Sequence, residues 1–166
     1  MSCIRYAAYG SNLHPVRLTE RLPSARLLGA GRLPAFSLSF EKRSLDGSGK
    51  CTISPGGGGV YVAVYEISLA DKQQLDMIEG VGKGYACITV DVPGFNHCTT
   101  YIAEDSHRDP AARPYDWYRE LVLLGCRYHG FPAEYIRHVG EVDADCDGNL
   151  ERRADNHRLL MRMYDQ

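Results

Sequence analysis

The sequence predicts an α+β fold in a single domain, because strand-like segments come first and helical segments follow. Short apolar or alternating segments, separated by glycine and proline, continue to about residue 103. Helical periodicity begins near Tyr115. A chain of 166 residues has the length of one domain, and its strands and helices do not alternate regularly.

Composition and charge narrow the class of protein. The chain is 44% hydrophobic, as expected for a globular domain. It carries 19 Lys and Arg against 21 Asp and Glu, a balance that argues against nucleic acid as a partner. No apolar run approaches the ~20 residues of a membrane span, and the start of the chain lacks the pattern of a secretory signal. We therefore expect a cytoplasmic protein that binds neither nucleic acid nor membrane.

The first elements can be placed in order. Ile4–Tyr9 is short and apolar and predicts a buried strand. A helix is expected over His14–Leu22, with Asn12 as its N-cap. The alternation in Phe36–Phe40 predicts a half-buried strand, and the composition of Arg43–Lys50 predicts a loop.

The middle of the chain is expected to contain a strand and a short helix. The glycine run Gly56–Gly59 lacks the Lys-Ser/Thr of a phosphate-binding loop and predicts a flexible hairpin loop before the strand Val60–Ile67. Ser68 and Asp71, three residues apart, resemble a capping box at the start of the helix Leu69–Glu79.

The remaining elements are a hairpin and a group of helices. The hairpin joins Gly84–Val92 to His97–Ala103 through Pro93-Gly94. The helices are expected over Tyr115–Tyr128 and Pro132–Val139, and residues 141–166 are expected to form a C-terminal helix or tail of the domain made by residues 1–140.

The six cysteines are widely scattered, without a C-x-x-C pair, and predict reduced and mostly buried thiols. The six histidines show no ligand spacing with cysteine or carboxylate, so no metal is expected.

The turn Tyr9-Gly10-Ser11-Asn12-Leu13 is the first candidate for chemistry. Backbone N–H groups in a glycine-containing turn at a helix start can form an anion-binding concavity. The turn then predicts a pocket for a carboxylate or an oxyanion. A simple strand-to-helix turn explains the same residues.

Glu79 is the second candidate. It ends an amphipathic helix, and glycine occupies three of the next five positions. Ile78 and Val81 border it, so partial desolvation would raise its pKa towards that of a general base. The alternative is a solvated glutamate at a helix C-terminus, where the helix dipole disfavours an anion.

Together these segments resemble the γ-glutamylcyclotransferase family. The resemblance rests on the first motif, on the acidic motif some 60 residues later, and on weaker patterns up to about residue 140. The matching residues are Tyr6-Ala7-Ala8-Tyr9-Gly10-Ser11-Asn12-Leu13, Leu75-Asp76, Glu79-Gly80, Tyr85, Phe36–Phe40, Thr52-Ile53, Val60–Tyr65, Pro114, Tyr118, Gly125, Gly130, Pro132 and Tyr135.

The resemblance implies an α+β fold built on a small mixed β-barrel with packed helices. It implies an enzyme that cyclises a γ-glutamyl group to 5-oxoproline and releases an amine or amino acid. Glu79 matches the general acid/base of the family, and the loop from Tyr6 to Asn12 (Tyr6, Ala7, Ala8, Tyr9, Gly10, Ser11, Asn12) matches its substrate-binding loop. Tyr85, Tyr101 and Tyr118 match pocket tyrosines.

The chemistry implied by the family requires no metal or organic cofactor, because the substrate supplies its own amine as the nucleophile. The expected partner is a small γ-glutamyl substrate, and a homodimer is left open. Val62 stands where the family often has glycine, which leaves the substrate size open. A second hypothesis is a non-catalytic module that binds a small carboxylate ligand, and a weaker third is a γ-glutamyl hydrolase or transferase.

Overall fold

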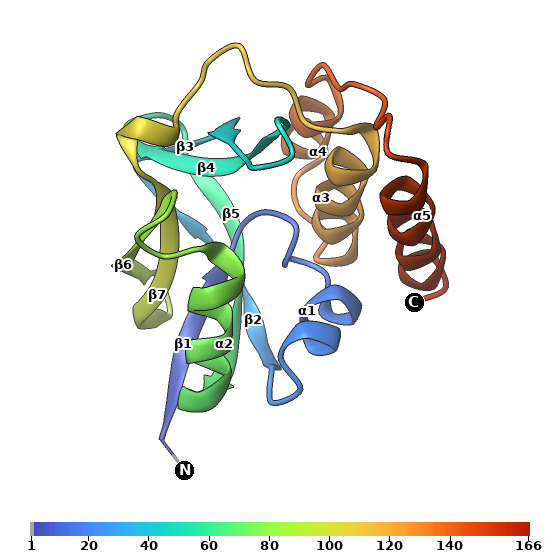
Figure 1. Cartoon of the computed structure of the whole chain (residues 1–166). Helices are drawn as coiled ribbons and strands as arrows, with labels where there is room; N and C mark the ends of the chain where they lie inside the picture. The colour runs from blue at the N-terminus through green and yellow to red at the C-terminus, as the bar shows by residue number, and fades with distance from the viewer. Residues whose placement is uncertain (1) are drawn as a thin grey trace.

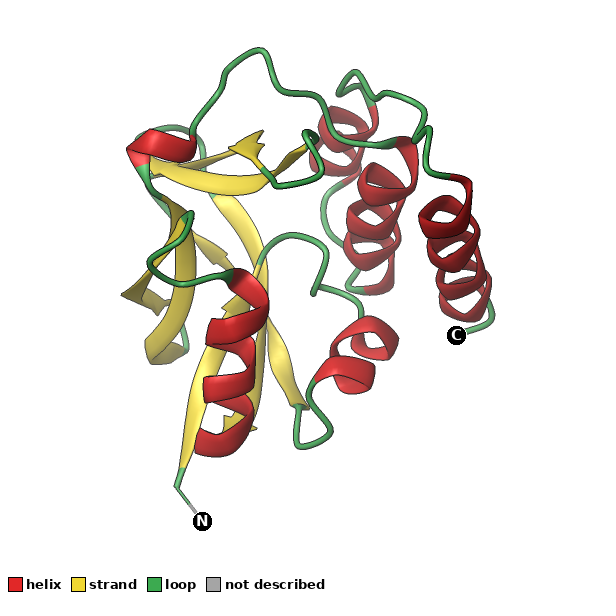
Figure 2. Cartoon of the chain, viewed as in Figure 1, coloured by secondary structure: helices red, strands yellow, loops and turns green. Residues whose placement is uncertain are grey.

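The computed structural model describes residues 2–166. The elements follow in the order β1 (Cys3–Ala8), α1 (Pro15–Arg21), β2 (Arg26–Leu33), β3 (Phe36–Arg43), β4 (Gly49–Pro55), β5 (Val60–Ser68), α2 (Leu69–Glu79), β6 (Tyr85–Val92), β7 (Phe95–Ala103), a 3-10 turn (Asp105–His107), α3 (Asp116–Tyr128), α4 (Ala133–Gly140) and α5 (Leu150–Tyr164). The predicted α+β class is confirmed, since the molecule contains both strands and helices (Figure 2). Along residues 2–166, three of the five α-helices follow the last strand.

The strands form one five-stranded sheet, in the order β2-β5-β1-β7-β6, and a separate pair, β3-β4. Among the strand pairs formed by residues 2–166, the pair of β1 and β7 is parallel and the others are antiparallel. β2 and β6 are free edges of the larger sheet, so the expected closed barrel is wrong.

The larger sheet curls without closing because β2 meets the β6–β7 hairpin through side chains. A Cβ atom placed on Gly31 would lie 2.7 Å from Val92 Cγ1, and one on Gly29 would lie 3.0 Å from the ring of Phe95. Two glycines therefore bring this edge close to the hairpin, but no strand pairing links them.

Several local predictions need correction. β2 was not predicted as a strand, because its glycines break the alternation. The run Gly56–Gly59 is not a hairpin loop, since it carries the chain from the β3-β4 pair to the other sheet. β4 begins at Gly49, inside the predicted loop. His14 rather than Asn12 caps α1, and its Nδ1 accepts from Val16 N–H at 3.3 Å.

Other local predictions are confirmed. The Ser68 hydroxyl caps α2 by accepting from Asp71 N–H at 3.1 Å. Asp71 does not complete the box, because its carboxylate accepts from the N–H and hydroxyl of Ser24. The β6–β7 hairpin forms as expected.

Figure 1 shows α3, α4 and α5 on one side of the molecule and the five-stranded sheet with α2 on the other. α3 contributes a run of buried side chains and contacts both α4 and α5. α5 buries Leu159, Leu160 and Met163, and Arg162 forms an ion pair with Glu20 on α1. The division of the domain at residue 140 stays a prediction.

Asp147 fastens the segment that precedes α5. Its side chain has no exposed surface, and Arg152 donates two hydrogen bonds to it, each 2.7 Å long. Trp117 Nε1 donates a third, at 2.9 Å. Arg152, followed by the other hydrogen bonds, holds the pKa of Asp147 well below its usual range.

Three cysteines are buried (Cys51, Cys98, Cys126) and three are exposed (Cys3, Cys87, Cys146), so the expectation of mostly buried thiols is half right. Within residues 2–166, no helix combines the length and the apolar character needed to cross a membrane.

Candidate active site

A narrow cavity of about 30 Å³ lies where β1 ends, between the loop that follows this strand and the end of α2. Five of its lining residues are tyrosines. The full lining is Tyr6, Tyr9, Gly10, Ser11, Asn12, Cys51, Glu79, Tyr85, Tyr101 and Tyr118.

The loop after β1 packs tightly around Gly10. Leu13 N–H donates to Gly10 C=O at 3.1 Å and closes the turn. A Cβ atom on Gly10 would lie 3.0 Å from Cys51 Cβ and 3.5 Å from the Tyr118 hydroxyl. A side chain at position 10 would therefore crowd the cavity wall.

Glu79 is the last residue of α2, and Gly80 ends the helix with φ 66°. Glu79 is half-buried, and it faces the cavity without an ion pair among residues 2–166. Burial raises the pKa of Glu79 above its usual value, opposed first by the charge of Arg21 and then by a hydrogen bond from Asn12. The result is a carboxyl group that holds a proton more readily than a solvated glutamate does.

Asn12 holds Glu79 in place. Its Nδ2 donates to Glu79 Oε1 at 3.2 Å and to the Tyr6 hydroxyl at 3.2 Å. Its Oδ1 accepts from Arg21 Nη1 at 3.2 Å, which fixes the amide. Asn12 is thus a positioning residue for the carboxylate and not the helix cap that the sequence predicts.

The cavity tyrosines fall into two groups. Tyr9, Tyr85 and Tyr101 donate to protein acceptors, which are Tyr101 C=O, Cys51 C=O and Asp76 Oδ1.

Tyr6 and Tyr118 instead accept hydrogen bonds, from Asn12 Nδ2 and from Cys51 N–H. A phenol that accepts can still donate its own hydrogen. Tyr6 and Tyr118 are therefore the two tyrosines equipped to donate to a bound molecule.

A second, wider cavity of about 220 Å³ adjoins the first, and we call it the basic cavity. The two share Ser11, Glu79, Tyr85 and Tyr118. Four cationic side chains also line it: Arg17, Arg21, Lys42 and Lys50. Glu79 is the one carboxylate among its lining residues within residues 2–166.

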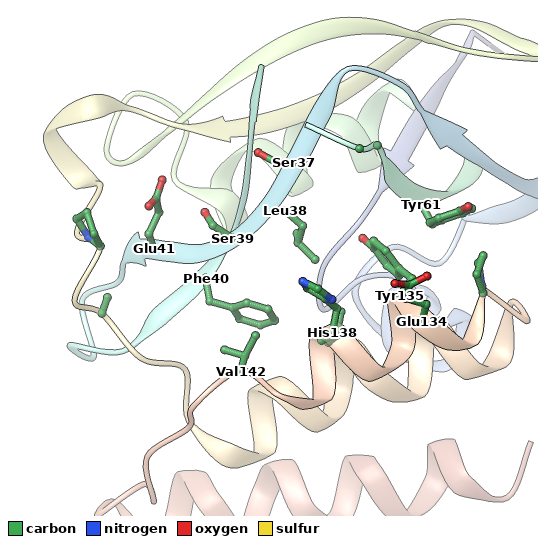
Figure 3. Close-up of a pocket in the computed structure, with 16 residues that line it drawn as sticks. Ser37, Leu38, Ser39, Phe40, Glu41, Tyr61, Glu134, Tyr135, His138 and Val142 are labelled. Carbon is green, nitrogen blue, oxygen red and sulfur yellow. The ribbon is translucent and has the colours of Figure 1, made fainter. Parts of the chain in front are cut away.

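A hollow larger than either of these, of about 660 Å³, lies elsewhere, between β3 and α4. Figure 3 shows Tyr135 and His138 of α4 facing Leu38 and Phe40 of β3 across it. None of the sequence-predicted site residues lines this outer groove. Size alone would therefore select a groove that contains none of the residues expected to carry the chemistry.

Comparisons with known proteins agree with the fold. Residues 59–139 match the model of the AIG2-like family. Over 150 residues the chain is 31% identical to γ-glutamylcyclotransferase of Homo sapiens, covering 83% of this chain and 78% of the relative. The Bos taurus relative of the same name gives the same identity and coverage. The chain belongs to the γ-glutamylcyclotransferase family.

A solved structure named γ-glutamyl cyclotransferase shares the fold of this family member, with a TM-score of 0.81 at 26% identity. The structural alignment covers 95% of this chain and 99% of the chain of the solved structure. The protein is accordingly an enzyme of the γ-glutamylcyclotransferase type.

The structure brings most of the sequence-predicted residues of this γ-glutamylcyclotransferase relative together at the narrow cavity. The exceptions are Ala7 and Ala8, which are buried in β1 and do not line it. Val62 is fully buried in β5, pairs with Gly31 and lines neither cavity. It therefore does not narrow either cavity directly.

Sequence reasoning missed Cys51 and the four cations. Arg17 and Arg21 are four residues apart within a predicted helix, a spacing that places both on one face and could have revealed them. Lys42 and Lys50 oppose each other in the β3-β4 pair, whose register the sequence does not show. Among residues 2–166, no group of three metal-ligating side chains comes together.

Proposed function

We propose that this enzyme converts a γ-glutamyl amino acid or amine into 5-oxoproline and the free amino acid or amine. The observation that supports this proposal is a half-buried carboxyl group, Glu79, which lies at the junction of two cavities and has no ion pair among residues 2–166.

The reaction needs orientation more than a protein nucleophile. The α-amine of the γ-glutamyl group attacks its own γ-carbonyl and forms the C–N bond of a five-membered ring. The amide bond to the leaving amine then breaks. Ideal intramolecular geometry contributes up to ~7–11 kcal/mol. Because the narrow cavity has room for only a few atoms, the reacting end of the substrate enters it and the leaving group stays in the basic cavity.

Two protons must move, and the proposal assigns both transfers to Glu79. An α-amine with a pKa of about 7.7–8.0 is mostly protonated at neutral pH and must lose a proton to attack. The leaving nitrogen must gain a proton, because an amide anion is a poor leaving group. Glu79 first accepts the proton and then donates it, and burial favours this cycle by raising its pKa.

Donors for the developing oxyanion are available beside Glu79. The N–H groups of Gly10 and Ser11 belong to a loop that lines the cavity. The hydroxyls of Tyr6 and Tyr118 can donate as well. Donors fixed before the reaction stabilise the charge that develops in the transition state.

The test is release of 5-oxoproline from γ-glutamyl-alanine by the wild type, by Glu79→Gln and by the matched control Glu66→Gln. Glu66 lies on β5, where it pairs with Arg26. The proposal predicts 5-oxoproline from the wild type and from the control, and a drop in kcat of about 10²–10⁴-fold for Glu79→Gln.

Three results would contradict the proposal. If Glu79→Gln released 5-oxoproline as fast as the wild type, Glu79 could not be the proton carrier. Free glutamate in place of 5-oxoproline would indicate a hydrolase, and binding of γ-glutamyl compounds without turnover would indicate a non-catalytic module.

A further inference from the structure

The basic cavity holds more positive charge than the protein itself neutralises. Lys50 is 3.3 Å from Asp46. Arg17, Arg21 and Lys42 have no carboxylate partner in an ion pair within residues 2–166. Lys42 is only 8% exposed, and Arg17 Nε is buried without a hydrogen-bond partner.

The arrangement of these cations is unfavourable for folding. Arg17 and Arg21 stand four residues apart on α1, and like charges at this spacing destabilise a helix. Lys42 and Lys50 are direct cross-strand partners, and like charges directly opposite destabilise a sheet. Two repulsive pairs on different elements thus face one cavity.

Burial adds to the unfavourable energy. It lowers the pKa of Lys42, of Lys50 and of Arg17, and the neighbouring Arg21 lowers that of Arg17 further. The rings of Tyr85 and Tyr118 offset part of it, since Lys42 Nζ lies 4.8 Å from the first ring centroid and Lys50 Nζ 4.4 Å from the second. An anion that a ligand brings into the basic cavity would offset this unfavourable energy, above all for Arg17, Arg21 and Lys42, which have no ion pair among residues 2–166.

The geometry points to an acidic leaving group: we propose that this enzyme acts on γ-glutamyl conjugates of amino acids with two carboxylates, such as γ-glutamyl-glutamate. This inference rests on the proposed function and assigns Arg17, Arg21, Lys42 and Lys50 to substrate selection. One carboxylate of the leaving amino acid is common to all γ-glutamyl dipeptides. The second is the feature that a cluster of four cations can select.

Charge can be separated from shape by two substrates. The wild type is assayed for 5-oxoproline with γ-glutamyl-glutamate and with γ-glutamyl-glutamine, whose leaving groups have the same shape and differ by one negative charge. We expect kcat/KM to favour γ-glutamyl-glutamate by about tenfold or more, since hydrogen bonds between charged groups are the strong ones. The preference should shrink as salt is added.

A variant and its matched control locate the effect. Lys42→Met should bring the ratio of the two kcat/KM values towards one, mainly through KM for γ-glutamyl-glutamate. Lys83→Met removes the same charge from an exposed lysine that lines neither cavity and should keep the wild-type ratio.

The outcomes separate this inference from the proposed function. 5-Oxoproline from both substrates with equal kcat/KM would overturn the acidic preference and leave the cyclotransferase standing. An equal change of ratio in both lysine variants would show an effect of net charge and would also overturn it. No 5-oxoproline from either substrate would overturn the proposed function and this inference with it.

Discussion

Asp147 and Glu79 are the same kind of group in opposite circumstances. Asp147, in the segment that precedes α5, has no exposed side-chain surface, and its oxygens accept hydrogen bonds from Arg152, Trp117 and the Asn149 N–H. Glu79 receives one side-chain hydrogen bond, from Asn12, and borders two cavities. The pKa of Asp147 is held down by Arg152, whereas burial raises that of Glu79.

The difference shows how a fold separates structural from chemical roles. A carboxylate whose partners are complete keeps its charge and fastens two segments. A carboxylate that is desolvated without a full set of partners can exchange a proton at moderate cost. The predictions below start from this contrast.

The largest effect should separate the two acids by activity. Glu79→Gln should lower kcat for 5-oxoproline release by about 10²–10⁴-fold, because the proton carrier is gone. Asp147→Asn should keep kcat near the wild-type value, since Asp147 lies outside both cavities. Steady-state assays of folded protein check this. A comparable loss of kcat in the two variants would break the comparison.

The free energy of unfolding should show the reverse pattern, with the large loss at Asp147. Asp147→Asn should lower the free energy of unfolding by about 2 kcal/mol, because Arg152 and Trp117 lose a charged acceptor. Asp155→Asn is the control, since it breaks an exposed pair with Arg158 that should contribute about 0–1 kcal/mol. Urea unfolding measures both. Equal losses would mean that burial of Asp147 adds nothing.

Asn12→Ala tests the hydrogen bond that Glu79 receives. The amide of Asn12 lowers the pKa of Glu79, so its removal should move the acidic limb of the pH–rate profile to higher pH and reduce kcat by about tenfold. A merely structural role would lower the amount of folded enzyme and leave the limb in place. The profile, measured over the full pH range, therefore decides between the two roles.

The smallest effect is the pH dependence of the free energy of unfolding, to which Asp147 and Glu79 should contribute with opposite signs. The Asp147 contribution is present above the unfolded pKa of about 3.9 and is lost as pH falls towards the lower folded pKa. Glu79 has a raised folded pKa, so its contribution is present below about pH 4.3 and is lost as pH rises.

Urea midpoints of the wild type and both variants across this range test the signs. The difference between the urea midpoints of the wild type and of Asp147→Asn should become smaller as the pH falls. The urea midpoint of Glu79→Gln should rise relative to that of the wild type as the pH rises. A Glu79→Gln curve parallel to the wild type would show that Glu79 is not desolvated.

The sequence predicts the contents of the narrow cavity better than its surroundings. The motif around Gly10 and the acid at Glu79 are local signals, so both could be found along the chain. Asn12 was found with the wrong local role, because a cap and a cavity amide look alike in sequence. The hydrogen bond to Glu79 spans 67 positions and leaves no local trace.

The open sheet and the basic cavity escaped prediction for a related reason. Whether β2 pairs with β6 depends on how the glycines at 29 and 31 pack, and periodicity does not show that. The pairing of Lys42 with Lys50 depends on a bulge between Ser39 and Lys42. Both are properties of register, which one sequence does not reveal.

The β3-β4 pair has a consequence for engineering. Leu33 and Val60, which flank it in the chain, are cross-strand partners in the larger sheet, with Cα atoms about 5 Å apart. The chain therefore leaves the larger sheet and returns to it at one place, and the two ends of the segment 34–59 are adjacent. Because this segment carries Lys42, Lys50 and Cys51, exchanging it between relatives would transplant part of the walls of both cavities, while β1, α2 and Glu79 stay in their own framework.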